Sequence, residues 1–173
     1  MLKIPTLPAI IAAAVGFVIV PTILLLVIKN EKKLKITTYI LTAVYFLILA
    51  CGVLAKVSIG KDVISVVFDF TNKWASKSID FDFIIDKTDL LLNIFMLIPI
   101  GGFCVVRCKN KKLSLLVGLL LGLATGFIIE SLQFVLPVYR GVQLSDVILN
   151  GASVLIGSIY FYLVWLIRNK IYK

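Results

Sequence analysis

Five long runs of apolar residues dominate the chain, and short stretches that contain charged residues separate them. The runs cover about residues 10–28, 36–57, 90–106, 113–136 and 147–167. A helix needs about 20 mostly apolar residues to cross a bilayer. Only helices and closed barrels satisfy their backbone hydrogen bonds in lipid. The pattern therefore predicts an all-α polytopic membrane helix bundle with five transmembrane helices.

The basic residues of the connecting stretches are unequally divided between the two ends of these helices. The stretches after the first, third and fifth runs hold 11 Lys and Arg residues and a single acid, Glu31. The opposite end holds 7 basic residues and the other 8 acids. Because cytoplasmic loops of membrane proteins are rich in Lys and Arg, we expect an outside N terminus and a cytoplasmic C terminus.

The long connection at 58–88 contains a second kind of pattern. Between Lys61 and Lys77, apolar residues recur at spacings of three and four: Val63, Val66, Val67, Phe70 and Trp74. This spacing predicts an amphipathic helix along the outer membrane surface, either as a lid over the bundle or as a surface that receives a lipid. Residues 79–83 alternate apolar and acidic positions, which predicts a short extended segment. Its Asp80 and Asp82 are either solvated acids or cation ligands.

Polar residues occur in pairs at helical spacing near the ends of the last three runs. The pairs are Asp89 with Asn93, Glu130 with Gln133, and Asp146 with Asn150. With the orientation above, all three pairs lie at the same outer level of the bilayer, and so does Arg140 in the short loop between the last two runs. Charged groups at membrane depth cost several kcal/mol unless they are paired or hydrated. We therefore predict that these seven residues form a ligand-binding polar cluster.

Structural explanations for the same residues remain open. Asp89 and Asp146 suit helix N-termini, where a carboxylate is favoured by the helix dipole, and the amides can join neighbouring helices by hydrogen bonds. Arg140 can pair with Glu130 or Asp146. Glu130 is the residue least explained in this way, because it lies within an apolar run and caps no helix terminus.

Composition narrows the classes of function. The chain of 173 residues is 61% hydrophobic with a mean hydropathy of +1.09, which excludes a soluble enzyme or a nucleic-acid-binding module as the whole chain. Its net charge of +9 is explained by topology, and the lack of histidine excludes histidine-based catalysis and His-ligated metals. The three cysteines follow no zinc spacing and are interpreted as reduced and structural. No cofactor and no metal are expected.

The predicted organisation has four segments. Two N-terminal transmembrane helices occupy 1–57, an extracellular amphipathic loop 58–88, a three-helix core 89–167 and a cytoplasmic basic tail 168–173. Within the core, Gly118, Gly122 and Gly126 form a stripe of small residues that predicts close helix packing, with a similar role for Gly151 and Gly157. Pro21 and Pro99 are expected to bend their helices.

Three sequence runs resemble the motifs of the VanZ-like family. They are Asp89–Gly101, Glu130–Arg140 and Asp146–Gly157, and the resemblance covers about residues 86–160. One departure is Ser153, where the family often has glycine. The resemblance implies a multi-pass protein of the bacterial cell membrane. It also implies a link to low-level resistance against teicoplanin and related lipoglycopeptides, the phenotype associated with the family's namesake.

These observations leave three functions open. In the first, the polar cluster is an outer-leaflet pocket that binds an amphiphilic or lipid-linked ligand, either a lipoglycopeptide or a cell-wall precursor. In the second, the chain is an enzyme for a lipid-linked cell-envelope substrate, with Glu130 and Asp146 as an acid–base pair. A transporter is less consistent with the sequence, because no inverted repeat is evident. The sequence leaves catalysis and the oligomeric state undetermined.

Overall fold

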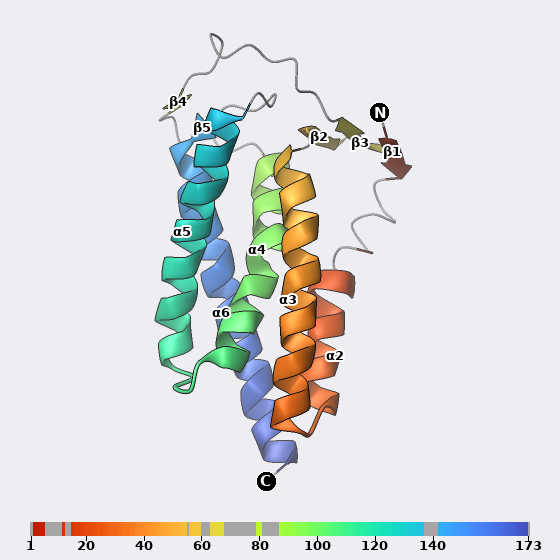
Figure 1. Cartoon of the computed structure of the whole chain (residues 1–173), viewed down its shortest axis with the longest axis vertical. Coiled ribbons are helices and arrows are strands. Elements are labelled where there is room, and N and C mark those ends of the chain that lie inside the picture. Colours follow the sequence, from red (N-terminus) through yellow and green to blue (C-terminus); the bar gives the residue numbers. More distant parts are fainter. Residues whose placement is uncertain are drawn as a thin grey trace.

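The computed structural model is a bundle of helices with short strands at one end (Figure 1). It describes residues 2–5, 12, 15–54, 56–59, 63–67, 79–80, 87–136 and 142–172. Side chains are described for 12, 15–50, 94, 96–136 and 143–172. The helices are η1 (Val15–Ile19, π-helical), α2 (Val20–Val27), α3 (Glu31–Leu54), α4 (Lys87–Arg107), α5 (Leu113–Val135) and α6 (Leu144–Ile171).

The mainly helical class is confirmed, and three helices meet the requirements of a membrane span. Among the described residues, Glu31–Ala50, Leu113–Val135 and Leu144–Ile171 are long and apolar enough to cross a bilayer. Two shorter apolar helices are Val15–Val27 and Met96–Arg107. The structure thus supports a membrane protein, whereas the count of five spans stays a prediction.

Short strands lie at the end of the bundle opposite the C terminus (Figure 1). β3 (Val63–Val67) pairs antiparallel with both β1 (Leu2–Pro5) and β2 (Lys56–Ile59). The helix predicted over 61–77 is therefore wrong at 63–67, and Phe70 and Trp74 lie outside the described residues. Four of the five β3 residues are β-branched, which favours extended backbone, and the two partner strands supply the ladder hydrogen bonds.

The predicted extended segment is confirmed over its first two residues. β4 (Ile79–Asp80) pairs in parallel with β5 (Val142–Gln143), which immediately precedes α6. Residues 81–83, with Asp82, lie outside the described part of the chain. This pairing joins the long connection to the start of α6.

Helix α6 is the centre of the bundle, because its main contacts are with both α4 and α5. A Cβ added at Gly101 of α4 would lie 2.2 Å from the Ser158 nitrogen of α6, and one at Gly157 would lie 2.3 Å from the Ile98 oxygen. On the α5 side, a Cβ at Gly122 would lie 2.8 Å from the Asn150 oxygen. The predicted packing role is confirmed for Gly122 and Gly157, and the structure adds Gly101, since only a residue without Cβ allows backbones to approach this closely.

The first apolar run is interrupted at Pro21. The π-helical turn η1 ends at Ile19, and Pro21 lies in the first turn of α2. Proline has no N–H to donate to a preceding turn, and π-helical turns occur where the regular hydrogen-bond ladder is disturbed. Pro99 lies inside α4.

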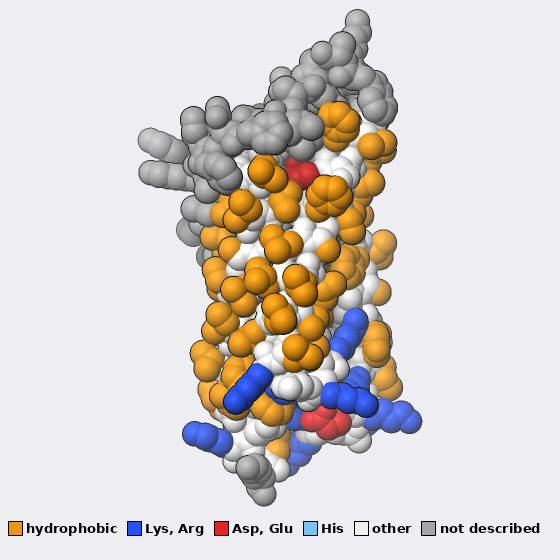
Figure 2. Space-filling model, turned by 90° about the vertical axis from the view of Figure 1, so that its left-hand side faces the viewer, with side chains coloured by type: hydrophobic (Ala, Val, Ile, Leu, Met, Phe, Trp, Pro, Cys, Tyr) orange, Lys and Arg blue, Asp and Glu red, His pale blue; other side chains and the backbone are white. Residues whose placement is uncertain are grey.

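Basic side chains gather at the end of the bundle that holds the C terminus, below a broad apolar surface (Figure 2). They come from the α2–α3 connection, the first turns of α3, the end of α4, the α4–α5 loop and the last turns of α6. The predicted basic tail begins as helix, because α6 continues to Ile171. We call this the basic end, and its described cations are Lys29, Lys32, Lys33, Lys35, Arg107, Lys109, Lys111, Lys112, Arg168 and Lys170.

Lys111 at the basic end provides a pH-dependent test of the packing. Its Nζ donates to the oxygens of Val105 and Val106, at 2.7 and 3.2 Å, and lies over the Trp165 ring. Burial lowers the pKa of Lys111 from its ordinary value of 10.5, with the nearby cations Lys35 and Arg168 acting in the same direction.

Between the lowered pKa and 10.5, the unfolded chain holds more protons than the folded one, so folding stability rises with pH there. We expect the free energy of unfolding of the wild type to rise relative to Lys111→Met as pH increases toward 10.5. Chemical unfolding in detergent at a series of pH values measures the difference. Parallel curves for the two proteins would contradict this expectation.

Candidate functional site

The register between α5 and α6 determines which polar residues meet. The two helices run antiparallel, and glycines of α5 face successive turns of α6: Gly118 lies against Ser158, Gly122 against Val154 and Gly126 against Asn150. One turn beyond Gly126 is Glu130, and one turn before Asn150 is Asp146. The same register therefore brings Glu130 level with Asp146.

The polar side chains at this end of α5 and α6 are buried. Relative exposure is 5% for Glu130, 2% for Gln133 and 2% for Asn150. Asp146 is half-buried in the first turn of α6. Four of the seven predicted site residues thus lie on two packed helices, at the end of the bundle away from the basic residues.

Glu130 has a structural contact that the sequence did not reveal. Its Oε2 accepts a hydrogen bond from the backbone N–H of Gln143 at 3.0 Å, and Gln143 is the residue that immediately precedes α6. The carboxylate of α5 thereby fixes the point at which α6 begins. Residues 130 and 143 are separated by the α5–α6 connection, so no local spacing rule could have found this contact.

For two of the remaining predicted residues, Asp89 and Asn93, the structure describes the backbone only. Asp89 and Asn93 lie on α4, which runs parallel to α6 and contacts it at Gly101 beside Ser158. Asp89 and Asn93 precede Gly101 by 12 and 8 residues, and Asp146 and Asn150 precede Ser158 by the same intervals. Because helices rise equally per residue, the two pairs are level along the bundle. The side chains of Asp89 and Asn93, and the whole of Arg140, lie outside the described part.

Buried serines of α6 belong to the same interface and were missed in the sequence. Ser145, Ser153 and Ser158 are exposed by 2% or less. Ser153 donates to the Leu149 oxygen at 2.7 Å. In the described structure, Ser145 Oγ, Ser158 Oγ and Asn150 Oδ1 are buried without a protein hydrogen-bond partner. Ser158 lies two turns after Asn150, a spacing that could have identified it as facing the same helix.

These residues can offer hydrogen-bond acceptors and donors to a polar group that reaches the interface. Burial strengthens such contacts, because water competes less for them. Among the described side chains, no group of three Cys, Asp or Glu is placed to hold a metal ion. Cys104 and Cys108 are free thiols. The chemistry visible in this region is hydrogen bonding by a carboxylate, amides and hydroxyls.

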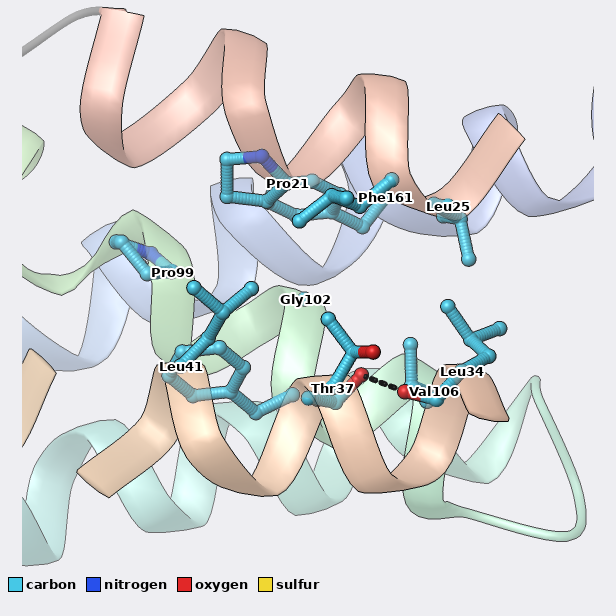
Figure 3. A pocket seen from close by; sticks show the side chains of 12 residues that line it. Pro21, Leu25, Leu34, Thr37, Leu41, Pro99, Gly102, Val106 and Phe161 are labelled. Atoms are coloured by element: carbon cyan, nitrogen blue, oxygen red, sulfur yellow. Dashed lines mark hydrogen bonds between the residues drawn. The ribbon is translucent and has the colours of Figure 1, made fainter. Parts of the chain in front are cut away.

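A separate cavity lies in the half of the bundle nearer the basic end (Figure 3). Its volume is about 30 Å³ and most of its lining is apolar. It is formed by α2, α3, α4 and α6, and its residues are Pro21, Leu24, Leu25, Leu34, Thr37, Thr38, Leu41, Pro99, Gly102, Phe103, Val106 and Phe161. Among the predicted polar site residues whose side chains the structure describes, none lines it.

Comparison with known proteins identifies one family. The family described as VanZ/LLP1 matches residues 36–166, which is most of the chain. The match includes the three motif-bearing segments and starts within α3. No curated protein and no solved structure gives a significant match.

Proposed function

Since the chain belongs to the VanZ/LLP1 family, we propose that it is a VanZ-like integral membrane protein that contributes to resistance against teicoplanin and related lipoglycopeptides. In this proposal a polar pocket in the outer leaflet engages an amphiphilic or lipid-linked ligand. The pocket comprises Asp89, Asn93, Glu130, Gln133, Arg140, Asp146 and Asn150. The family match supports the membrane protein class, and the remainder is our inference.

The proposed topology has five membrane spans, an outside N terminus and a cytoplasmic C terminus. Its support is the separation of charge along the bundle. The basic end is on one side (Figure 2), and the acids Glu130, which is buried, and Asp146, which is half-buried, lie toward the other. Lys and Arg favour the cytoplasmic side, so the polar residues of α5 and α6 face the cell exterior in this orientation. A ligand then reaches them from the outer leaflet without crossing the membrane.

One observation carries the ligand-binding proposal, namely the burial of Glu130 and Asn150 at the level of Asp146. Ionisable groups inside a membrane are costly. Glu130 accepts a hydrogen bond from the backbone N–H of Gln143, which holds its carboxylate beside the start of α6. Asn150 Oδ1 adds a buried acceptor with no protein donor in the described structure. A sugar or headgroup hydroxyl or ammonium group would supply such donors.

The proposal predicts that Glu130→Gln removes protection while the protein still folds. The amide oxygen of Gln can accept the Gln143 N–H, so the start of α6 is preserved, but the negative charge is lost. We expect teicoplanin susceptibility of a sensitive Gram-positive host with this variant to equal that with empty vector. The wild-type chain should lower susceptibility at the same membrane abundance.

Phe127→Leu is the matched control, because Phe127 is 66% exposed and precedes Glu130 by one turn on α5. It should protect as well as the wild type. Equal protection by Glu130→Gln would make this carboxylate dispensable and would shift attention to the connection around Trp74. A lack of protection by the wild type would show that the family phenotype does not extend to this chain.

A further inference from the structure

The cavity near the basic end is a partly open notch between α2 and α3. The two helices have different main partners, because α2 packs on α6 and α3 packs on α4. Figure 3 shows side chains of α2, such as Pro21 and Leu25, facing those of α3, such as Leu34 and Leu41. We call this the α2–α3 notch, with the lining given above. It lies within the apolar part of the bundle, where lipid is the surrounding solvent.

The chemistry of the notch suits hydrocarbon. Proline, leucine, valine and phenylalanine side chains make up most of its lining. The hydroxyl of Thr38 donates to the Leu34 oxygen at 2.7 Å, so it needs no further partner. A space of about 30 Å³ accommodates roughly two groups of about the size of a water molecule or a methylene, since about 10–15 Å³ is enough for one water molecule. The notch therefore fits a segment of an acyl chain.

Two cations lie at the end of the notch nearest the basic end. Lys33 precedes Thr37 by four residues on α3, which places both on one helix face about 6 Å apart along the axis. Lys29 follows Ile28, the extended C-cap residue of α2, and its Nζ lies 5.3 Å from the centre of the Tyr172 ring at the end of α6. Both lysines are exposed. In the chain, Lys29 follows the lining residues of α2 and Lys33 precedes those of α3, so both lie on the basic-end side of the notch without lining it.

The only acid described at the basic end does not neutralise these two lysines directly. Glu31 Oε1 lies 2.7 Å from Nη1 of Arg168, which is 4% exposed and held in place by further bonds. The surface around Lys29 and Lys33 therefore presents positive charge beside an apolar recess. Basic side chains at a membrane surface attract anionic headgroups, and basic pockets between transmembrane helices bind phospholipids of this kind.

We propose that the α2–α3 notch is a binding site for an anionic phospholipid of the leaflet that meets the basic end. The acyl chain enters the notch, and the phosphate lies between Lys29 and Lys33. This site is distinct from the polar cluster of α5 and α6, and it would hold α2, the shortest of the described α-helices, against the rest of the bundle. A zwitterionic lipid with the same chains would fill the notch without the charge contact.

The test measures the lipids retained by the full chain. The protein is purified in mild detergent with an equimolar mixture of phosphatidylglycerol and phosphatidylcholine of identical acyl chains, and bound lipids are counted by native mass spectrometry. We expect the wild type to retain phosphatidylglycerol preferentially. Each of Lys29→Gln and Lys33→Gln should lower that preference about fivefold, the effect of one lysine near an anionic surface.

Matched control variants distinguish a specific phospholipid site in the notch from a general attraction of anionic lipid to the basic end. Lys109→Gln and Lys112→Gln remove the same charge from the α4–α5 loop, and they should leave the preference unchanged. Thr37→Leu fills the notch and should lower retention of both lipids, whereas Ala43→Leu adds a similar side chain at an exposed position of α3 and should not. Thermal unfolding confirms that each variant is folded.

Either of two results would overturn the proposal. One is an equal loss of preference in the α4–α5 loop variants and in the Lys29 and Lys33 variants, which would assign the effect to the overall charge of the basic end. The other is unchanged retention in a folded Thr37→Leu protein. Competition with inorganic phosphate should displace little lipid, because phosphate lacks the acyl chain.

Discussion

Replacing Gly101 or Gly157 by alanine should destabilise the bundle by about 3 kcal/mol, the upper part of the range for overpacked interiors. At both positions the new Cβ would meet backbone atoms of the facing helix, at 2.2 Å for Gly101 and 2.3 Å for Gly157. A flexible side chain could rotate away from such a contact, but a helix backbone cannot. The axes of α4 and α6 would have to separate, with loss of the packing around Leu97 and Val154.

Gly16→Ala is the control for this prediction. A Cβ at Gly16 would meet nothing within 4 Å, so we expect its free energy of unfolding to remain within about 0.5 kcal/mol of the wild type. Unfolding in mixed micelles of SDS and a mild detergent measures all three variants. A loss of less than 1 kcal/mol for both Gly101→Ala and Gly157→Ala would show that α4 and α6 do not approach as closely as described.

The second large effect concerns Arg168, which joins three helices at the basic end. Its Nη1 bonds Glu31 on α3 at 2.7 Å, and its Nη2 donates to the oxygens of Ile28 and Lys29 after α2, each at 3.0 Å. These carbonyls follow the last turn of α2, where the helix itself supplies no donors. Arg168→Gln should cost about 3 kcal/mol, because hydrogen bonds from a charged donor are worth about 1.5–3 kcal/mol each.

Two further variants identify which bonds matter. Glu31 is 63% exposed, so Glu31→Gln should cost at most about 1 kcal/mol, as expected for a surface ion pair. Arg168→Lys retains the charge but lacks the planar fork that reaches in two directions, so it should restore little stability. The same unfolding measurement applies. Equal losses in Arg168→Gln and Glu31→Gln would assign the effect to the ion pair and contradict the role of the carbonyls.

The sequence anticipated the helices well, because the length and polarity of an apolar run are local properties. Each of the five apolar runs overlaps a helical segment, and the boundaries of the last two runs differ from those of α5 and α6 by a few residues. The failure at Val63–Val67 has a different origin. One of its partner strands, Lys56–Ile59, is close in the sequence, but the other, Leu2–Pro5, is about 60 residues away. A pairing over that distance leaves no mark on the local periodicity.

The sequence predicted at which height along the bundle the polar residues of the candidate site lie, but it did not predict which atoms they contact. Spacing placed each polar pair on one helix face, and the register of α5 on α6 brings Glu130 and Asp146 to one level. The bond from the Gln143 N–H to Glu130, however, depends on where the chain returns after α5. Spacing in the sequence shows which residues share a face of one helix, whereas this hydrogen bond joins α5 to the residue that precedes α6.

By itself, the sequence determined that the chain is a helical membrane protein, which residues carry its polar motifs and which family it resembles. It also identified the packing glycines of α5 and α6, whereas the close contact of Gly101 came from the structure. The tertiary structure alone decided that α6 is central, that Arg168 holds the ends of α2 and α3, and that a notch remains between those two helices. The physical reason is that the apolar composition of a segment determines whether that segment is stable as a helix in lipid. Helix partners, by contrast, are chosen by complementary shape and hydrogen bonds between residues that are distant in the chain.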